Sequence, residues 1–205
     1  MAKPRRKLNE TSKSEATRRK ILDAAARAFL QKGYEATTLQ EIAEAASMQA
    51  GSLYYHFDSK EQLLAEVFDI GMRRVVEAAR EAVAALPADA PFADKLTAAV
   101  AAHLEQLLGQ GDYTSANIRI FGQAPEGVRA RQLRLREAYG EWWRALLEEG
   151  RARGEVRADA DPGLLRMLLF GAMNWAIEWY DPTQGPIAKI ADEASALLLR
   201  GLLAR

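Results

Sequence analysis

The sequence has no cysteine and only two histidines among its 205 residues. Without cysteine the chain can form neither a disulfide framework nor a thiolate metal site, and two histidines leave little for a zinc site or a histidine-based triad. The longest apolar run, Met167–Ile177, is too short to cross a bilayer. The first residues are too polar for the apolar region of a signal peptide. We therefore expect a cytoplasmic chain without a metal site, a cofactor or a membrane partner.

Charge is spread unevenly along a chain whose formal net charge is zero. Residues 1–20 hold eight basic and two acidic side chains, a net charge of +6, so the rest of the chain sums to −6. A basic end on an acidic body favours a polyanion bound at that end. The alternative is a solubilising tail that touches nothing. We expect residues 1–11, which include Pro4, to form a flexible basic arm.

The stretch Thr37–Lys60 has the pattern of two short helices across a tight turn. Thr38 and Glu41 can form a capping box, in which each side chain accepts from the backbone N–H of the other residue. Apolar positions at helical spacing follow, until Ser47 interrupts them ahead of a second short helix over about Gln49–Tyr55. A helix-turn-helix of this kind can place its second helix in the major groove of B-DNA. Two helices of an ordinary bundle are the alternative.

Residue types along the second helix suit contact with DNA. The small residues Ala50 and Gly51 let its backbone approach base edges closely, and the donors on Tyr54 and His56 can meet phosphates. Lys60 lies near the start of the next helix, where a cation and free N–H groups could bind a phosphate.

The same stretch resembles the DNA-binding domain of the TetR family. The residues in register with that family's pattern are Thr38, Ile42, Ala43, Gly51, Ser52, Leu53, Tyr54, His56, Phe57, Ser59, Lys60, Glu61 and Leu63. Ser47 departs from the pattern because a turn glycine is usual there, and we expect a mildly strained left-handed residue. Gln49 departs because a serine cap is usual there, which leaves the start of the second helix less defined.

The resemblance implies a DNA interface on both short helices. Gln40, near the start of the first, would touch a base or else stay solvated. The residues predicted to bind DNA are Thr38, Gln40, Gln49, Ala50, Gly51, Ser52, Tyr54, Tyr55, His56 and Lys60.

Helical periodicity runs through the rest of the chain, interrupted by glycine and proline. We expect a first helix from the capping box at Ser12 to about Lys32, with Gly33 as its C-cap. The later helices are expected at 59–86, 92–108, 113–121, 126–153, 162–180 and 187–203. No segment alternates convincingly as a strand, so the sequence predicts an all-α chain of about nine helices. Its domains would be the arm over 1–11, the DNA-binding domain over 12–60, and a ligand-binding and dimerisation domain over 61–205.

The last two expected helices hold more apolar surface than one small bundle usually buries. The helix that follows Asp161 is apolar on almost every side, and a helix of this kind must be buried on every side. Pairing of two copies into a four-helix contact would bury that surface. It would also place two recognition helices about 34–36 Å apart, one turn of DNA. We expect a homodimer, which the resemblance also implies; a monomer with this stripe in its own core is the alternative.

An all-α body rich in aromatic residues could enclose an apolar pocket with a few polar anchors. Asn174 would need a partner there, supplied by the backbone, by water or by a ligand. An internally bonded amide in a solid core is the alternative. His103, a single histidine within a helix, we expect to be structural or solvated. The residues predicted to bind ligand are Arg119, Phe121, Trp142, Met173, Asn174, Trp175 and Trp179.

The run from Phe170 to Tyr180 is similar to a TetR-family subgroup that includes regulators of fatty-acid and sterol breakdown. Their effectors are acyl-CoA thioesters, so the resemblance implies an acyl-CoA or another hydrophobic small molecule. Arg119, Arg131 or Arg134 would then meet CoA phosphates, unless they are only solvated helix arginines.

Three classes of function remain to be weighed. An enzyme is disfavoured, because no nucleophile, base and orienting group lie at a recognisable spacing. A DNA-binding or activating protein without an effector would have a solid body. The sequence favours a ligand-responsive transcriptional regulator, a repressor that binds a palindromic operator as a dimer and is released by a small hydrophobic effector.

Overall fold

A computed structural model describes residues 5–109 and 111–203, which are mostly helical. The α-helices are α1 (Arg5–Lys32), α2 (Leu39–Ala45), α3 (Ala50–Leu53), α4 (Lys60–Ala84), α5 (Phe92–Leu108), α6 (Asp112–Arg119), α7 (Glu126–Ala152), α8 (Pro162–Trp179) and α9 (Ile187–Leu202). Two short 3₁₀ helices, η1 (Phe121–Gln123) and η2 (Pro182–Gln184), complete the order. Within the described ranges the β geometry is limited to an isolated bridge between Val156 and Leu203. The predicted all-α fold of about nine helices is confirmed.

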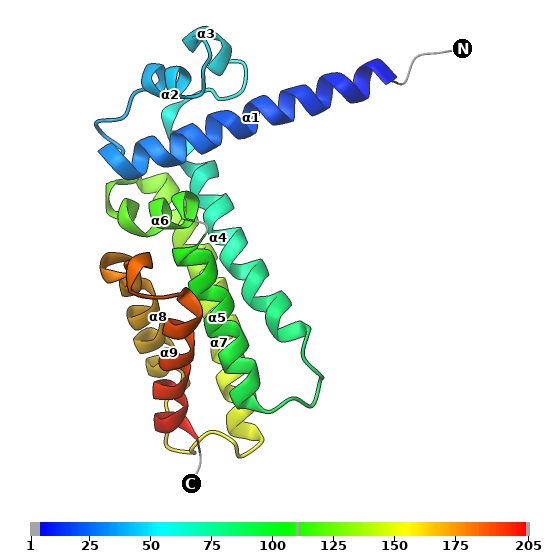
Figure 1. Ribbon diagram of the computed structural model, residues 1–205, viewed down its shortest axis with the longest axis vertical. Helices are drawn as coiled ribbons and strands as arrows, with labels where there is room; N and C mark the ends of the chain where they lie inside the picture. The colour runs from blue at the N-terminus through cyan, green and yellow to red at the C-terminus, as the bar shows by residue number, and fades with distance from the viewer. Residues whose placement is uncertain (1–4, 110, 204–205) are drawn as a thin grey trace.

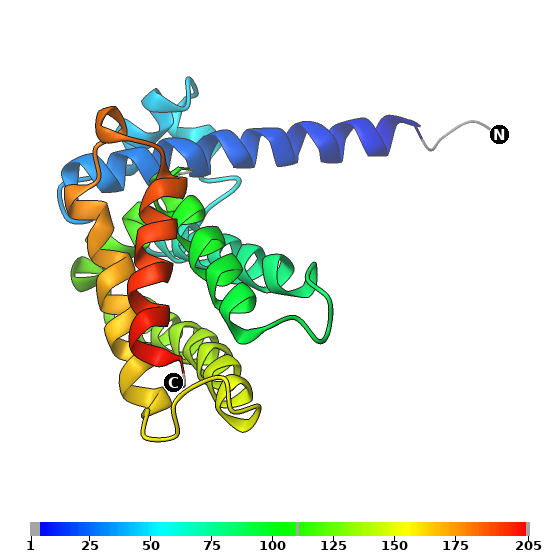
Figure 2. The ribbon, with the colours of Figure 1, turned by 60° about the horizontal axis from the view of Figure 1, so that its bottom comes forward.

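The helices form two parts, which we call the head (α1–α3) and the body (α4–α9). In Figure 1, α4 descends from the head along the body, α5 and α7 run beside it, and α8 and α9 lie on the far side from α4. The turned view in Figure 2 shows the N-terminal half of α1 extending well beyond the rest of the molecule. None of the helices in the described part is long and apolar enough to span a membrane.

The start of α1 differs from the prediction. The capping box at Ser12 predicted a helix that begins there, but α1 begins at Arg5, so residues 5–11 of the predicted flexible arm are helical. This segment contains neither glycine nor proline, and its Arg, Lys, Leu and Glu residues favour helix. A residue able to cap therefore lies inside the helix here instead of starting it. The remainder of the predicted arm, residues 1–4, lies outside the described residues.

The end of α1 follows the prediction. Gly33 has φ +80°, and a Cβ at this position would lie 2.5 Å from Oε1 of Gln123. Glycine is therefore favoured by the left-handed backbone, and a side chain here would displace the end of Gln123.

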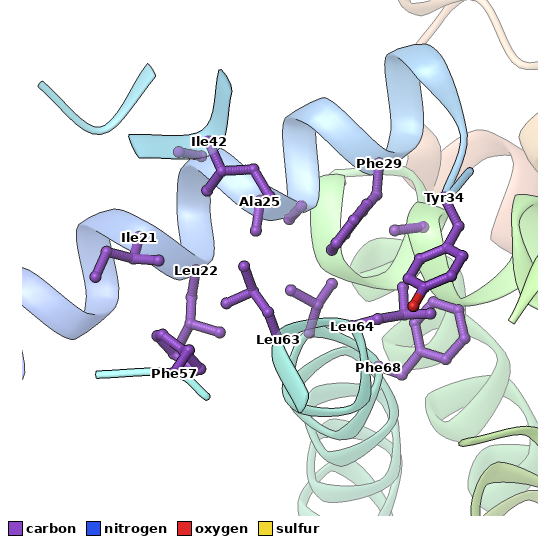
Figure 3. Packing of buried hydrophobic residues seen from close by; sticks show 14 of the residues in the cluster. Ile21, Leu22, Ala25, Phe29, Tyr34, Ile42, Phe57, Leu63, Leu64 and Phe68 are labelled. Atoms are coloured by element: carbon purple, nitrogen blue, oxygen red, sulfur yellow. The ribbon is translucent and has the colours of Figure 1, made fainter. Parts of the chain in front are cut away.

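The core between head and body is formed by α1, α4 and α6. In Figure 3, Phe29 of α1 points toward Leu64 of α4, Leu22 of α1 reaches Phe57 beside Leu63, and Ile21 lies next to Leu22 on the same helix. All of these side chains are buried. A second core fills the body around Trp143, which is 1% exposed. Because α4 contributes to both cores, a shift of α4 in the body would be felt in the head.

Candidate DNA-binding surface and effector cavity

The capping box at the start of α2 is confirmed. The Glu41 N–H donates to Oγ1 of Thr38 at 3.2 Å, and the Thr38 N–H donates to Oε2 of Glu41 at 2.9 Å. Lys32 also donates to Glu41 Oε1, at 2.7 Å. The bond from Lys32 and then those from Thr38 lower the pKa of Glu41 to about 2. The first helix of the motif is therefore fixed at its N-terminus and tied to the end of α1.

The turn between α2 and α3 shows both departures from the family pattern. Ser47 has φ 58°, and within the described residues it is the one residue other than glycine with a positive φ. Gln49 occupies the N-cap position of α3, but its side chain makes no capping hydrogen bond. Both consequences were predicted from the sequence.

The short helix α3 and the turn that follows it present a polar and aromatic surface to solvent. Leu53 and Phe57 point into the core, whereas Tyr54 is 56% exposed and Tyr55 is 91% exposed. At Gly51 a Cβ would meet no atom of the described chain within 4 Å, so packing inside the protein does not require glycine there. The exposed helix is therefore open to close approach by a partner.

The other predicted DNA-binding residues lie on the same side of the head or beside it. Thr38, Gln40, Gln49 and Ser52 are exposed, while Ala50 and His56 are half-buried. The Gln40 amide donates to Oε1 of Glu44 at 3.1 Å, and this bond holds it along α2.

Arg18 holds the segment after α3 against α1, although in the sequence it is only one of the basic residues near the N-terminus. Its Nη1 donates to the His56 carbonyl at 2.8 Å, and its Nε donates to Oε1 of Glu66 at 3.1 Å. The guanidinium also lies 4.2 Å from the centre of the Phe57 ring. No local pattern marks this residue, because its partners lie 38 and 48 positions further along the chain.

Lys60 is placed differently from the prediction. Its ammonium donates to the carbonyls of Tyr34, Glu35 and Thr37 at 2.9, 3.3 and 3.0 Å, and it lies 4.4 Å from the centre of the Tyr34 ring. The free cation expected at a phosphate is thus directed toward the turn between α1 and α2. This arrangement favours a role in ordering the turn.

We expect Lys60→Met to lower the free energy of unfolding by about 1–3 kcal/mol, because backbone carbonyls lose a charged donor while the apolar stem is kept. Urea denaturation would measure this effect. A salt dependence of DNA binding whose slope falls by about one in the variant would instead return Lys60 to the phosphate contacts.

A cavity of about 300 Å³ lies in the body, where α4–α8 surround it. Its polar lining includes His103 of α5, Asn117 of α6, Arg136 of α7 and Asn174 of α8, and its apolar lining includes Phe170. The cavity has the size and the mixed lining typical of a site for a small ligand.

His103 lies at the centre of the polar lining. As a neutral imidazole it accepts at Nδ1 from the Tyr139 hydroxyl at 3.3 Å and donates from Nε2 to Oδ1 of Asn174 at 3.2 Å. Burial lowers the pKa of His103 to about 4, and the bond to Asn174 opposes this shift only in part. His103 is therefore uncharged at neutral pH. It was expected to be structural or solvated, and it is buried in the cavity wall.

The predicted ligand residues do not form one site. Asn174 lines the cavity, whereas Met173 and Trp179 line a second, open cavity of about 530 Å³ that lies between α8 and α9. Trp175 is 66% exposed. Successive residues of a helix point about 100° apart, so the adjacent positions of this run cannot face one pocket. Trp142 is half-buried and stacks on Tyr139.

The arginines chosen from the sequence are engaged on the surface. Nε of Arg119 donates to Oε1 of Glu178, and Nε of Arg131 donates to Oδ1 of Asp69, each at 3.1 Å. Arg134 is exposed. The arginine of α7 that lines the cavity is Arg136, whose guanidinium lies 3.9 Å from the centre of the ring of Phe121. The prediction that Phe121 contacts ligand directly has no support in the cavity lining.

Comparison with known proteins decides the family. A family model described as "Bacterial regulatory proteins, tetR family" matches residues 21–67, and one described as "Tetracyclin repressor-like, C-terminal domain" matches residues 89–202. The transcriptional repressor KstR2 of Rhodococcus jostii (strain RHA1) is 30% identical over 201 residues, 95% of each chain. The chain belongs to the TetR family. It is a DNA-binding transcriptional regulator and not an enzyme, as the sequence predicted.

Solved structures of TetR-family regulators share the fold. PfmR of Thermus thermophilus is 30% identical with a TM-score of 0.78, over 90% of this chain and 99% of its own. AibR, solved in complex with isovaleryl coenzyme A and operator DNA, is 26% identical with a TM-score of 0.79, over 89% of this chain and 98% of its own.

In this TetR-family chain, α6 separates the cavity from the head. Thr114 and Asn117 line the cavity on one side of α6. On the other side the Tyr113 hydroxyl donates to Oδ1 of Asp23 in α1 at 2.6 Å. Beyond α6, Oε1 of Gln123 accepts from the Tyr34 N–H at 2.8 Å. If a ligand in the cavity displaced α6, both hydrogen bonds to the head would be affected, the one from Tyr113 to Asp23 and the one from Tyr34 to Gln123.

The TetR-family body also exposes a continuous apolar face on α8 and α9. The exposed large side chains of this face are Leu164, Met167, Leu168, Trp175, Trp179 and Leu197. The expectation that α8 is buried on every side is therefore not met within one chain. Such a face on a folded body is typical of an interface.

Proposed function

We propose that the chain is a dimeric repressor that binds a palindromic operator through α3 and leaves it when a small hydrophobic effector occupies the body. The observation that carries the DNA-binding part is the outward surface of α3 and of the turn that follows it. Tyr54 and Tyr55 of that turn are exposed, while Leu53 at the end of α3 and Phe57 after the turn are anchored in the core. A short helix held in this way can be inserted into a groove as a rigid unit.

The apolar face of α8 and α9 supports the dimer. Pairing of this face with that of a second copy would bury apolar side chains that solvent now surrounds, at about 25 cal/mol per Å² of apolar area. It would also hold two heads in a fixed relation, which a palindromic operator requires. The cytoplasm, where the operator lies, would be its place of action.

The effector is proposed from the cavity and from the relatives. AibR was solved with isovaleryl coenzyme A, and an acyl-CoA is the effector class that we propose for this chain. The cavity of about 300 Å³ is too small for a whole CoA thioester, so it would hold one part of the effector, with Phe170 and its apolar neighbours against the apolar atoms of that part.

Release from DNA would be a change between two states. An effector can shift this equilibrium only if it binds the released state more tightly than the DNA-bound state. The links from Tyr113 to Asp23 and from Gln123 to Tyr34 are the contacts through which α6 would change the position of the head.

Selection of duplexes from a random pool tests the proposal. We expect the full chain to select a palindrome whose half-sites lie about one helical turn apart. Tyr55→Ala should weaken binding to that duplex about tenfold or more, and Tyr55→Phe separates the ring from the hydroxyl. Failure to select any duplex would contradict the proposed function. An operator affinity that no acyl-CoA changes would favour a regulator without an effector.

A further inference from the structure

Arg136 is a half-buried cation that lacks an anionic partner. One of its terminal nitrogens, Nη2, donates to both the main-chain oxygen and Oδ1 of Asn117, at 2.8 Å each. Across the described ranges, no carboxylate lies within ion-pair distance of this guanidinium. Burial lowers its pKa. A desolvated guanidinium with only neutral acceptors is costly, because its charge is not compensated.

Arg166 brings a second guanidinium to the same stretch of α7. Its side chain is 15% exposed and packs on Gly140, where a Cβ would collide with the guanidinium. Gly140 follows Arg136 by one helical turn, and residues four apart on a helix are neighbours. Both arginines line the cavity.

The acidic residues near Arg166 neutralise it only in part. Nη1 lies 3.4 Å from Oε1 of Glu137 and 3.5 Å from Oε1 of Glu141, and both carboxylates are largely open to solvent. Nε of Arg166 is buried without a hydrogen-bond partner. The donors of this guanidinium are therefore incompletely used, which distinguishes it from Arg119 and Arg131 on the surface.

The cavity lining holds two guanidinium groups, of Arg136 and Arg166, and one carboxylate, of Glu137. An anion placed between the two arginines would balance the second positive charge and accept from the free donors. The C-terminal end of α6, whose carbonyl groups Arg136 meets at Asn117, supplies only a partial negative charge.

We propose that the cavity binds the anionic group of the effector, a carboxylate or a phosphate, between Arg136 and Arg166. This inference rests on the proposed effector-binding function and specifies the chemistry of its ligand. A cavity of about 300 Å³ suits a compact anionic group with an apolar part beside it. The apolar part of the ligand lies toward Phe170.

An anion bound to Arg136 would also connect the ligand to the head. An anion that accepts from Nη2 of Arg136 competes with Asn117 for this donor, and Asn117 also donates to the Phe68 carbonyl of α4 at 3.1 Å. Loss of the bond between Arg136 and Asn117 would weaken the contact between α6 and α7, which Asn117 also makes by donating to Oε1 of Gln132 at 3.0 Å. The occupied cavity would then favour a different position of α6, and through Tyr113 a different position of α1.

The test compares octanoate, the neutral octanamide and octanoyl-CoA as ligands of the full chain, by calorimetric titration and by thermal shift. We expect octanoate or octanoyl-CoA to bind the wild type about tenfold or more tightly than octanamide, since hydrogen bonds between charged groups are the stronger ones. Preference for octanoate identifies a carboxylate as the anion, and binding of octanoyl-CoA alone identifies a phosphate.

Variants assign the effect to the two arginines. Arg136→Gln and Arg166→Gln should each reduce the preference for the anion about tenfold, Arg136→Lys should retain part of it, and the exposed Arg134→Gln should leave it unchanged. Equal binding of octanamide and the anions, an unchanged preference in Arg136→Gln, or no binding of any anion would overturn the proposal.

Operator binding by the same proteins is followed in parallel. A chain that releases its operator with octanamide alone refutes the anion and retains the regulator, whereas a chain that binds no operator refutes the proposed function itself.

Discussion

Replacement of Leu168 by glutamate is expected to convert the protein to a monomer and to weaken operator binding by roughly 10²–10⁴-fold. Leu168 is 63% exposed on the apolar face of α8, so a charge there should not disturb the fold of one chain. In a dimer the same side chain would be buried, and an unpaired carboxylate would oppose association. A dimer binds its operator more tightly than a monomer because its two DNA-binding helices are joined in one molecule, and the monomeric variant would lose this increase in affinity.

Sedimentation equilibrium would measure the association, and fluorescence anisotropy with the selected duplex would measure the affinity. Leu135→Glu is the matched control, because Leu135 is an exposed apolar residue of α7 outside the α8 and α9 face. A Leu168→Glu variant that stays dimeric and binds the operator normally would show that the two copies meet elsewhere or not at all.

Acidification from pH 6.5 to 4 is expected to remove about 3 kcal/mol of stability through His103 alone. The pKa of His103 is lowered from 6.5 to about 4 in the folded chain, chiefly by burial. Between these values the unfolded chain binds more protons than the folded chain, so the free energy of unfolding falls as the pH falls. Well above pH 6.5 both states are neutral at this residue, and its contribution no longer changes with pH.

Chemical denaturation of the wild type and of His103→Gln across this range isolates the contribution from those of other groups. The variant should lose the part of the slope that comes from His103, whereas His56→Gln, which alters the other, half-buried histidine, should retain it. Identical pH profiles for the wild type and His103→Gln would mean that solvent reaches the imidazole.

Local sequence signals account for much of the fold and for the head. The capping box of Thr38 and Glu41 and the glycine after α1 act within a few residues of the chain, and they begin and end helices as predicted. The start of α1 was wrong because propensity over residues 5–11 outweighed one capping signal. The exposed surface of α3 and the turn after it follows from the same local pattern, since Leu53 and Phe57 are the apolar positions of that segment.

The composition of the cavity could not be predicted in this way. The sequence singled out Asn174, but its partner His103 lies 71 positions away in the chain. Trp175, the neighbour of Asn174, points to solvent, because one step along a helix changes the face.

By itself, the sequence determined the helices, the helix-turn-helix and the membership of a regulator family, because these depend on short-range backbone and side-chain signals. Only the tertiary structure decided that Arg136 lines the cavity, whereas Arg131, five positions earlier on the same helix, pairs with Asp69. It also decided that Lys60 serves the turn after α1. The physical reason is that the partner of a charged side chain is set by how whole helices pack against each other, and residues far apart in the chain determine that packing.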